Sequence, residues 1–285
     1  MDNLLTYEAS VNWLRSQPQH SQLVELCYLD RDNLMAAERF RLSEEFNETI
    51  KILHIDKQQK LKILDIGCGN GIAAYSFALL GHEVYAIDPD MSADVGLGAT
   101  NKLASTINKG SISTHQAFAE KLPFADATFD IIYARQALHH FTNLSQGLSE
   151  CSRVLKPKGL FFATREHVVS DREQLKTFLD EHILHKLHGG ENAHTLKEYV
   201  SAIEQSGIKL LNLFAPFDTV INHFPLSNLD IKKSLFERAA RKLGKLPAAI
   251  ILKTPFIEKA YRYYLSQTCK QPGRLYSFLG VKNKI

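Results

Sequence analysis

Cysteine is scarce in this chain of 285 residues: there are four, and none belongs to a C-x-x-C pair. Neither a disulfide scaffold nor a zinc ribbon is therefore expected. Long apolar runs are also missing, since none approaches the roughly 18 residues that span a bilayer. The first residues, MDNLLTYEAS, lack a basic stretch followed by an apolar one. We therefore predict no secretory signal and a reducing, cytoplasmic location.

Apolar residues are plentiful and charge is unevenly spread. Hydrophobic residues make up 45% of the chain, enough for a core, so disorder is excluded as the main state. The net charge of +3 combines +10 over residues 226–285, with thirteen Lys or Arg against three Asp or Glu, and −7 over residues 1–225. Such a basic segment indicates either an anionic partner or ordinary solvated helix faces, and both interpretations stay open.

Short β-branched segments alternate with helical ones after Lys60. The predicted strands lie at 62–66, 83–87, 129–134, 159–164, 209–214 and 273–282. Helices are predicted over 72–80 and 195–205, the second starting at a capping box of Thr195 and Glu198. This alternation predicts an α/β fold with a doubly wound, mostly parallel sheet.

We divide the chain into three parts: a helical N-terminal lid over residues 1–58, an α/β core over 59–167, and the remainder over 168–285. In the remainder, about residues 193–217 and 273–283 are predicted to complete the sheet. The other two segments, about 168–192 and 218–272, are predicted to be helical insertions. Both insertions leave from strand ends, where a lid over a ligand site is expected. Residues 226–266 are predicted to form two helices that separate near Gly244–Pro247.

A glycine-rich loop, Gly67-Cys68-Gly69-Asn70-Gly71, follows the first predicted strand. Glycines at such a place permit a tight turn and a close approach of a ligand to the backbone. The spacing G-x-G-x-G differs from the G-x-G-x-x-G of dinucleotide-binding loops, so the pattern gives no reason to expect a pyrophosphate. Asp88 ends the next strand, where a carboxylate can accept hydrogen bonds from both hydroxyls of a ribose.

Five motifs occur in order: the loop with Asp65, then Asp88, AEKLPF at 119–124, Phe129-Asp130, and RVLKPKG at 153–159. Together they resemble the motifs of class I S-adenosylmethionine-dependent methyltransferases, most closely the type 11 small-molecule branch that includes quinone-biosynthesis methyltransferases. The resemblance covers about residues 60–167 and weakens over 168–285. It implies a seven-stranded Rossmann-like sheet and S-adenosylmethionine as cofactor. The implied reaction is in-line transfer of a methyl group to an O, N or C atom of a small molecule positioned by the lid.

The resemblance also implies roles for residues. Asp65 would accept from the methionine amino group, the glycine loop would lie against methionine and ribose, and Asp88 would hold the ribose hydroxyls. Many relatives carry an acidic residue where Phe118 stands, which accepts from the adenine amino group. Here either Phe118 would stack on the adenine ring or Glu120 would take the polar role. The expected cofactor-binding residues are Asp65, Gly67, Cys68, Gly69, Asn70, Gly71, Asp88, Pro89, Phe118, Ala119, Glu120 and Arg135.

The methyl acceptor is expected just past the fourth strand, where Ala134-Arg135-Gln136-Ala137 precedes a histidine pair. His139 and His140 are the candidate catalytic residues, because an imidazole can act as a base near neutral pH when the acceptor is a hydroxyl. Alternatively, both start a helix and pack structurally. Amino-group methyltransferases of DNA and RNA resemble each other in an Asn/Asp-Pro-Pro-aromatic box at this place. Its absence argues against a nucleic-acid partner.

Histidines gather after the fifth strand. The candidate substrate-binding residues are Arg165, Glu166, His167 and His185. His182 and His188 lie on the same predicted helical stretch, but they are turned about 240° from one another around its axis. The histidines there cannot share one narrow stripe, so we predict no metal site.

Two other functions compete with small-molecule methylation. The basic segment favours an enzyme acting on RNA or on a lipid-linked or other anionic saccharide, with Lys253–Tyr264 as an interfacial helix. Because Phe118 replaces the acidic residue of many relatives, the chain could alternatively be a cofactor-binding partner protein without transferase activity. The expected partner is a small-molecule acceptor, anionic if the basic segment covers the methyl group, and peripheral membrane contact is the weaker expectation.

Overall fold

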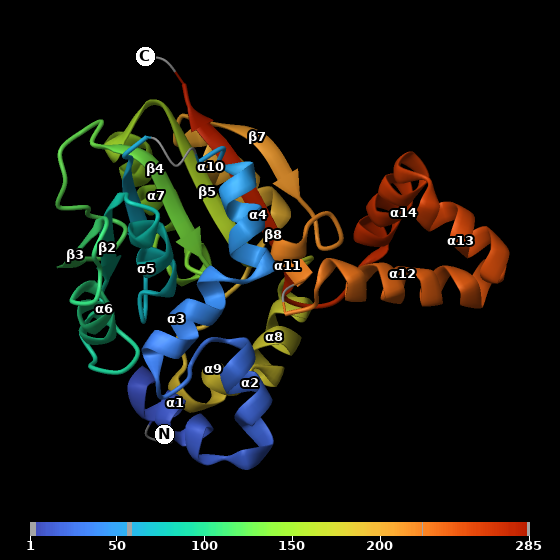
Figure 1. The fold of residues 1–285 in the computed structure, drawn as a ribbon, viewed down its shortest axis with the longest axis horizontal. Helices are drawn as coiled ribbons and strands as arrows, with labels where there is room; N and C mark the ends of the chain where they lie inside the picture. The colour runs from blue at the N-terminus through green and yellow to red at the C-terminus, as the bar shows by residue number, and fades with distance from the viewer. Residues whose placement is uncertain (1–3, 56–58, 224, 284–285) are drawn as a thin grey trace.

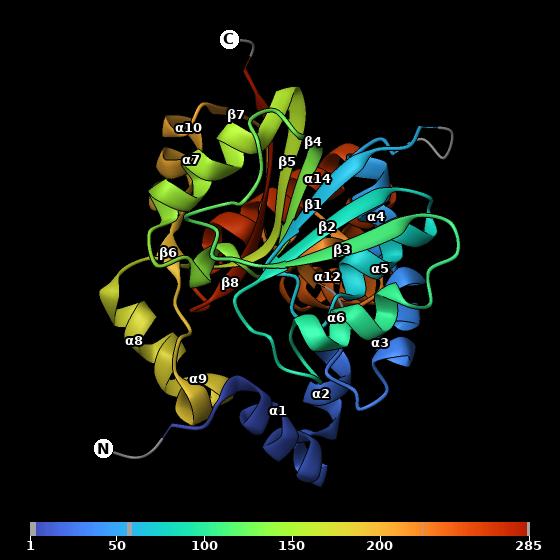
Figure 2. The same ribbon diagram turned by 90° about the vertical axis from the view of Figure 1, so that its left-hand side faces the viewer.

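A computed structural model of the chain describes residues 4–55, 59–223 and 225–283. Its strands are β1 (Lys62–Ile66), β2 (Glu83–Asp88), β3 (Ser111–Gln116), β4 (Phe129–Arg135), β5 (Leu155–Val169), β6 (His194–Thr195), β7 (Ile208–Phe214) and β8 (Arg274–Lys282). One sheet in the order β3-β2-β1-β4-β5-β8-β7 forms the centre of the molecule (Figures 1 and 2). The α/β fold predicted from the sequence is confirmed.

Parallel pairing dominates the sheet. β1 is parallel to β2 and β4, β3 is parallel to β2, and β5 is parallel to β4. β8 runs antiparallel to both β5 and β7. These seven strands form the predicted sheet, and the two-residue β6 adds a short parallel pairing with β5. The carboxyl ends of β1, β2, β4 and β5 therefore meet at one edge, where ligands of such sheets bind.

Helices cover both faces of the sheet, as doubly wound topology requires. On one face α3 (Asn33–Arg41), α4 (Glu44–Ile52), α5 (Ile72–Leu79) and α6 (Leu97–Ala104) share a core with β1 and β2. On the other face α7 (Leu144–Val154) and α10 (Leu196–Gln205) pack on β4 and β5. α10 begins at the capping box formed by Thr195 and Glu198, as predicted. The fully buried strands explain why β1 and β4 are almost continuously apolar.

The N-terminal helices meet the first insertion at the carboxyl edge of the sheet. These elements are α1 (Tyr7–Ser16), η1 (Pro18–His20), α2 (Ser21–Leu26), α8 (Arg172–Glu181) and α9 (Ile183–His188). Val11 and Leu14 of α1 pack with Leu184 and Leu187 of α9, and Val95 after β2 joins the same cluster. The Leu5 N–H donates to the Leu187 carbonyl (2.9 Å). The lid roles of residues 1–58 and 168–192 stay predictions.

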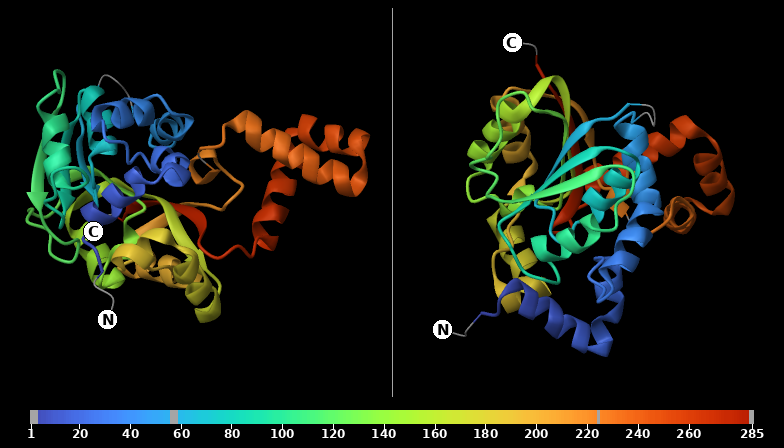
Figure 3. Two further views of the ribbon diagram at one scale, coloured as in Figure 1. Left: turned by 90° about the horizontal axis from the view of Figure 1, so that it is seen from below. Right: turned by 60° about the vertical axis from the view of Figure 1, so that its left-hand side comes forward.

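The second insertion projects away from the sheet (Figures 1 and 3). After α11 (Val220–His223) it forms α12 (Asn228–Leu243), α13 (Lys245–Lys253) and α14 (Pro255–Thr268), which we call the arm. The prediction of two helices over 226–266 is wrong, because Pro255 starts a third helix at a position that proline favours. The predicted break near Gly244 is found between α12 and α13. In the described part of the chain, no helix combines the length and apolarity needed to cross a bilayer. The lid role of 218–272 stays a prediction.

Candidate active site

The glycine loop turns sharply between β1 and α5 at the carboxyl edge. Gly67 and Gly71 have φ values of 65° and 80°, a left-handed conformation that side chains rarely adopt. A Cβ atom at Gly67 would lie 2.7 Å from the Ala137 Cβ, so the loop also needs glycine to approach the segment after β4. Gly67 is exposed although the strand before it is buried, and its backbone is therefore open to a ligand.

Asp88 at the end of β2 is oriented by two backbone amides. The Gly69 N–H donates to its Oδ2 atom and the Asp90 N–H to its Oδ1 atom, each at 2.9 Å. Partial burial raises the pKa of Asp88, whereas these hydrogen bonds lower it. Each carboxylate oxygen keeps a further lone pair, so Asp88 has the chemistry to accept the two hydroxyls of a ribose.

Asp65 at the end of β1 is a buried carboxylate with unused hydrogen-bonding capacity. Its side chain is 2% exposed, and within the described residues its Oδ2 atom has no hydrogen-bond partner. Burial raises the pKa of Asp65 to about 7. A buried acceptor without a donor is costly, and a cationic amino group would satisfy it. The residues present thus fit the amino acid part of S-adenosylmethionine.

The other residues predicted to bind the cofactor surround this loop. Cys68 and Asn70 are buried, and Asn70 donates to the Tyr28 carbonyl (2.8 Å). Phe118 is 63% exposed, which leaves a ring face free to stack on a base. Ala119 beside it is buried, Pro89 is exposed, and Glu120 accepts from the Asn143 N–H (2.9 Å). Their contacts with the cofactor stay predictions.

Glu166 on β5 fixes the segment after β4, where η2 (Leu138–His140) begins. This fully buried carboxylate accepts from the backbone N–H groups of Ala137, Leu138 and His139 at 3.0–3.2 Å. It also lies 2.7 Å from Nδ1 of His139. Burial raises the pKa of Glu166 and lowers that of His139 far below its usual range. His139 is therefore neutral near pH 7, with its proton on Nδ1 and its Nε2 atom free to accept.

Glu191 brings a second carboxylate to the two histidines. Its Oε2 atom lies 3.8 Å from Nε2 of His139 and 3.9 Å from Nε2 of His140. Gly189 and Gly190, both with a φ of 78°, turn the chain between α9 and Glu191. We call His139, His140 and Glu191 the imidazole–carboxylate cluster. The side chain of His140 is 46% exposed, so the cluster is reached from outside mainly at this residue.

The cluster lies close to the predicted cofactor residues. His140 lowers the pKa of Asp88 by its electrostatic interaction. The carboxylates of Glu191 and Asp88 both contribute to raising the pKa of the Tyr7 phenol on α1, although burial is the larger cause. β2 and β4 are both parallel neighbours of β1, and the Gly67 loop after β1 approaches Ala137 just before the cluster. The end of β2 and the cluster therefore lie at the same carboxyl edge.

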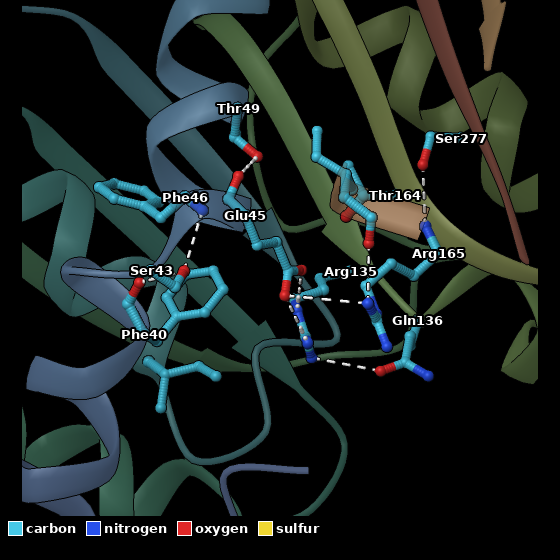
Figure 4. A network of polar contacts seen from close by, with 12 residues as sticks. Phe40, Ser43, Glu45, Phe46, Thr49, Arg135, Gln136, Thr164, Arg165 and Ser277 are labelled. Carbon is cyan, nitrogen blue, oxygen red and sulfur yellow. Dashed lines mark hydrogen bonds and ion pairs between the residues drawn. The ribbon is translucent and has the colours of Figure 1, made fainter. Parts of the chain in front are cut away.

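Arg135 is held by an acidic residue of an N-terminal helix (Figure 4). Its Nε and Nη2 atoms donate to the two carboxylate oxygens of Glu45 on α4, at 2.7 and 3.1 Å. Arg165 lies 4.0 Å from the same carboxylate and donates to the Ile221 carbonyl (2.7 Å). The Arg135 guanidinium is engaged in this buried ion pair, and its cofactor contact stays a prediction.

The four predicted substrate residues do not form one surface. Arg165 and Glu166 are buried in the networks described above. His167 lies 3.0 Å from the Gly273 carbonyl through Nδ1, and burial lowers its pKa to about 3. The backbone N–H of His185 lies 3.4 Å from Nδ1 of His182, which precedes α9. A direct substrate contact stays a prediction for each of them.

Glu45 and Glu191, which the structure places in these networks, are not among the predicted site residues. Glu45 shares a helix face with Thr49 and Leu53, at i, i+4 and i+8, and all three are buried. A carboxylate among buried positions of a helix indicates a cationic partner in the core. This pattern could have predicted an ion pair for Glu45 from the sequence. Glu191 follows a glycine pair in a loop, and no local pattern indicates its contact with residues some fifty positions earlier.

Comparisons with known proteins find methyltransferases. Residues 64–163 match a family model described as a methyltransferase domain. The ubiquinone biosynthesis O-methyltransferase of Rhizobium leguminosarum bv. trifolii is 25% identical over 76% of this chain and 95% of its own. The sterol 4-C-methyltransferase strm-1 of Caenorhabditis elegans is 31% identical over 57% of this chain and 50% of its own.

Among solved structures, the geranyl diphosphate C-methyltransferase of Streptomyces coelicolor superposes with a TM-score of 0.53. It is 15% identical, and the match covers 83% of this chain and 76% of that one. The fold is the Rossmann-like fold of these methyltransferases. The chain contains a methyltransferase domain at residues 64–163 and is similar to class I S-adenosylmethionine-dependent methyltransferases that act on small molecules.

Proposed function

We propose that the enzyme transfers the methyl group to a hydroxyl oxygen of a small molecule bound at the end of β4. The imidazole–carboxylate cluster carries the proposal, because it lies at the same edge as Asp65 and Asp88. A hydroxyl acceptor has to lose its proton as the methyl group arrives, and such side chains support that loss. The relative from Rhizobium, which is named as an O-methyltransferase, supports an oxygen acceptor.

The cofactor would be held by residues that fit it. Asp65 would accept from its amino group, Asp88 would accept from its ribose hydroxyls, and the backbone at Gly67 would lie against it. When bound, S-adenosylmethionine supplies a methyl group already activated on a sulfonium. The chain then has to align the acceptor and keep water out.

The predicted lid suits this task. Glu8 of α1 accepts from the Asp94 N–H (2.8 Å) in the segment after β2, and α1 packs on α9. These contacts bring two distant segments over the edge where Asp88 and His140 lie. Closure by α1 and α9 would exclude water from the acceptor and fix its hydroxyl beside the cluster.

Loss of Asp88 tests the cofactor half of the proposal. Asp88→Ala should weaken S-adenosylmethionine binding by about 1.5–3 kcal/mol, because a charged hydrogen-bond acceptor is lost. Asp94→Ala, a change of the same kind on the exposed segment after β2, should leave the affinity unchanged. Isothermal titration calorimetry measures both, and equal affinities for wild type and Asp88→Ala would contradict the assignment.

The acceptor half is tested with a panel of phenols, catechols and aliphatic alcohols. Formation of S-adenosylhomocysteine with hydroxyl acceptors, together with an O-methyl product identified by NMR, is the expected result. His140→Ala should lower kcat more than it raises the Kd of the cofactor. A product methylated only on carbon or nitrogen would overturn the oxygen assignment while leaving the class of enzyme intact.

A further inference from the structure

The imidazole–carboxylate cluster has the geometry of an incomplete coordination shell. One ligand atom each from His139, His140 and Glu191 lies within 4.8 Å of the others. Nitrogen and oxygen ligands of a tetrahedral zinc ion lie about 3.3–3.5 Å apart. The Glu191 carboxylate lies 3.8 and 3.9 Å from the two Nε2 atoms, so these two separations need a contraction of about half an ångström. The two histidine nitrogens, which lie within 4.8 Å of each other, have to approach by up to about 1.4 Å to close the shell.

The second nitrogen of each imidazole is already held. Nδ1 of His139 lies 2.7 Å from the Glu166 carboxylate, and Nδ1 of His140 lies 3.2 Å from the Gly190 carbonyl. Both partners are acceptors, so each ring carries its proton on Nδ1 and turns the lone pair of Nε2 toward Glu191. Metal-binding histidines are oriented in the same way by a carboxylate or carbonyl behind the ring.

The Glu191 carboxylate is largely buried and has no close hydrogen-bond donor among the three histidines around it, so a cation would stabilise it. Its side chain is only 9% exposed, and it lies 3.8–3.9 Å from His139, His140 and His182. These separations are too long for hydrogen bonds. A carboxylate removed from water is stable only when a positive charge or close donors compensate it.

We propose that His139, His140 and Glu191 bind a first-row divalent cation, best Zn²⁺, with Glu166 as the positioning residue behind His139. Two imidazoles and one carboxylate are the ligand set of zinc sites that keep an open coordination position, whereas Mg²⁺ prefers oxygen ligands alone. If the function proposed above holds, the acceptor oxygen would take the open position. The ion would lower the pKa of that hydroxyl, and its proton would pass to bulk water before the lid closes over the acceptor.

Binding of metal alone tests the site. The full-length protein, freed of metal with a chelator, is titrated with Co²⁺ while its visible absorption is recorded, and Zn²⁺ is then added as a competitor. We expect one ion per chain, displaced by Zn²⁺, and no binding of Mg²⁺. His140→Ala and Glu191→Gln should abolish the Co²⁺ spectrum. Glu166→Gln should weaken binding by about 10–100-fold, as loss of the group behind a ligand does.

Two controls keep the result interpretable. His20→Ala, which changes a partly buried histidine of η1 outside the cluster, should leave the Co²⁺ titration unchanged. Calorimetry with S-adenosylmethionine shows that each variant is folded. A folded wild-type protein that binds neither Co²⁺ nor Zn²⁺ would overturn the metal site. O-methyl transfer that persists in the presence of a chelator would overturn the site's proposed part in the reaction and leave the proposed function standing.

The arm carries a second, independent inference. Its tip exposes large apolar side chains: Leu246 is 80% exposed and Phe256 82%, and Leu243 and Ile250 are also exposed. Figure 1 shows α13 as the helix farthest from the sheet. The arm Asn228–Thr268 contains nine Lys or Arg against three Asp or Glu. Apolar side chains flanked by Lys242, Lys245 and Lys253 have the composition of a segment that lies on an anionic bilayer.

We infer that the tip of the arm binds the surface of anionic membranes. Full-length protein should co-sediment with vesicles containing phosphatidylglycerol and remain in solution with phosphatidylcholine alone, and added salt should release it. Leu246→Ser with Phe256→Ser should abolish co-sedimentation, while Leu211→Ser on exposed β7 should not. A dimer in light scattering that depends on Leu246 and Phe256, without vesicle binding, would assign the tip to a second copy and overturn the inference.

Discussion

At the scale of one residue, the buried carboxylate of Asp65 lowers the stability of the ligand-free protein. Burial raises its pKa to about 7, so the ionised form is disfavoured before a ligand arrives. Since the pKa in the unfolded chain is about 3.9, the cost to folding is present above that value and is relieved as the pH falls. A cationic ligand reverses the balance, because it stabilises the ionised form.

We therefore predict that S-adenosylmethionine binds more weakly as the pH falls below 7, because Asp65 must first lose a proton. The affinity should drop by up to about tenfold per pH unit. Asp65→Asn should bind weakly at every pH and show a flat profile in calorimetry between about pH 5.5 and 7.

The free Asp65→Asn variant should also unfold at a higher temperature than wild type at pH 8, since the buried charge is gone. The matched variant Asp94→Asn should change neither the melting temperature nor the affinity. A pH profile that is steep in Asp65→Asn would show that another group is responsible.

At the scale of elements, one ion pair joins the N-terminal helices to the sheet. Glu45 of α4 and Arg135 of β4 meet with both side chains largely buried, 0% and 12% exposed. The Arg135 guanidinium also lies 5.4 Å from the Phe40 ring centroid. The backbone is strained at Gln136 and Arg165, next to this ion pair, because their φ values are 51° and 60°. The ends of β4 and β5 are thus shaped by a helix some ninety residues earlier.

Removing one partner of this pair should be severe. Glu45→Ala and Arg135→Met should each lower the free energy of unfolding by about 3–5 kcal/mol, because an unpaired charge stays buried. The double variant should lose less than the sum of both. Urea unfolding measures the cycle, and strictly additive losses would show that the two side chains do not interact. Lys51→Met, whose exposed pairing with Glu48 is weak, serves as the control.

The sequence predicts the elements whose pattern is local. β1, β2 and β4 are apolar runs because both of their faces are buried, and Asp65 and Asp88 stand out as carboxylates at the ends of such runs. β3 has the sequence SISTHQ and lies at the edge of the sheet with little burial, so it lacks that signal. Glu45 and Glu191 reach the site through tertiary contacts, which no local period contains.

At the scale of the whole molecule, the arm is nearly separate from the body. Its own small core joins Ile231 and Leu235 to Val220 of α11. The Phe217 N–H donates to the Ser266 hydroxyl (3.2 Å), so the two ends of the arm lie side by side. We therefore expect the body to fold around its sheet when the arm is replaced by a short connection.

Excision of residues 228–262 with a Gly/Ser linker should leave the Kd for S-adenosylmethionine unchanged. Because Val220 loses its cover, the melting temperature should fall slightly, by about 2–4 °C for each kcal/mol lost. Differential scanning calorimetry and isothermal titration measure the two effects. Loss of cooperative unfolding would show that the arm is part of the core.

β8 lies between β5 and β7, yet it follows every other strand of the described chain. During synthesis, β7 has no strand partner and β5 presents an open edge until residues 274–282 have left the ribosome. An unpaired strand edge is a template for aggregation. A nascent chain that stalls in the arm would therefore contain the complete cofactor-binding strands but a sheet with exposed edges at β5 and β7. Correct folding during synthesis thus depends on the last strand, β8.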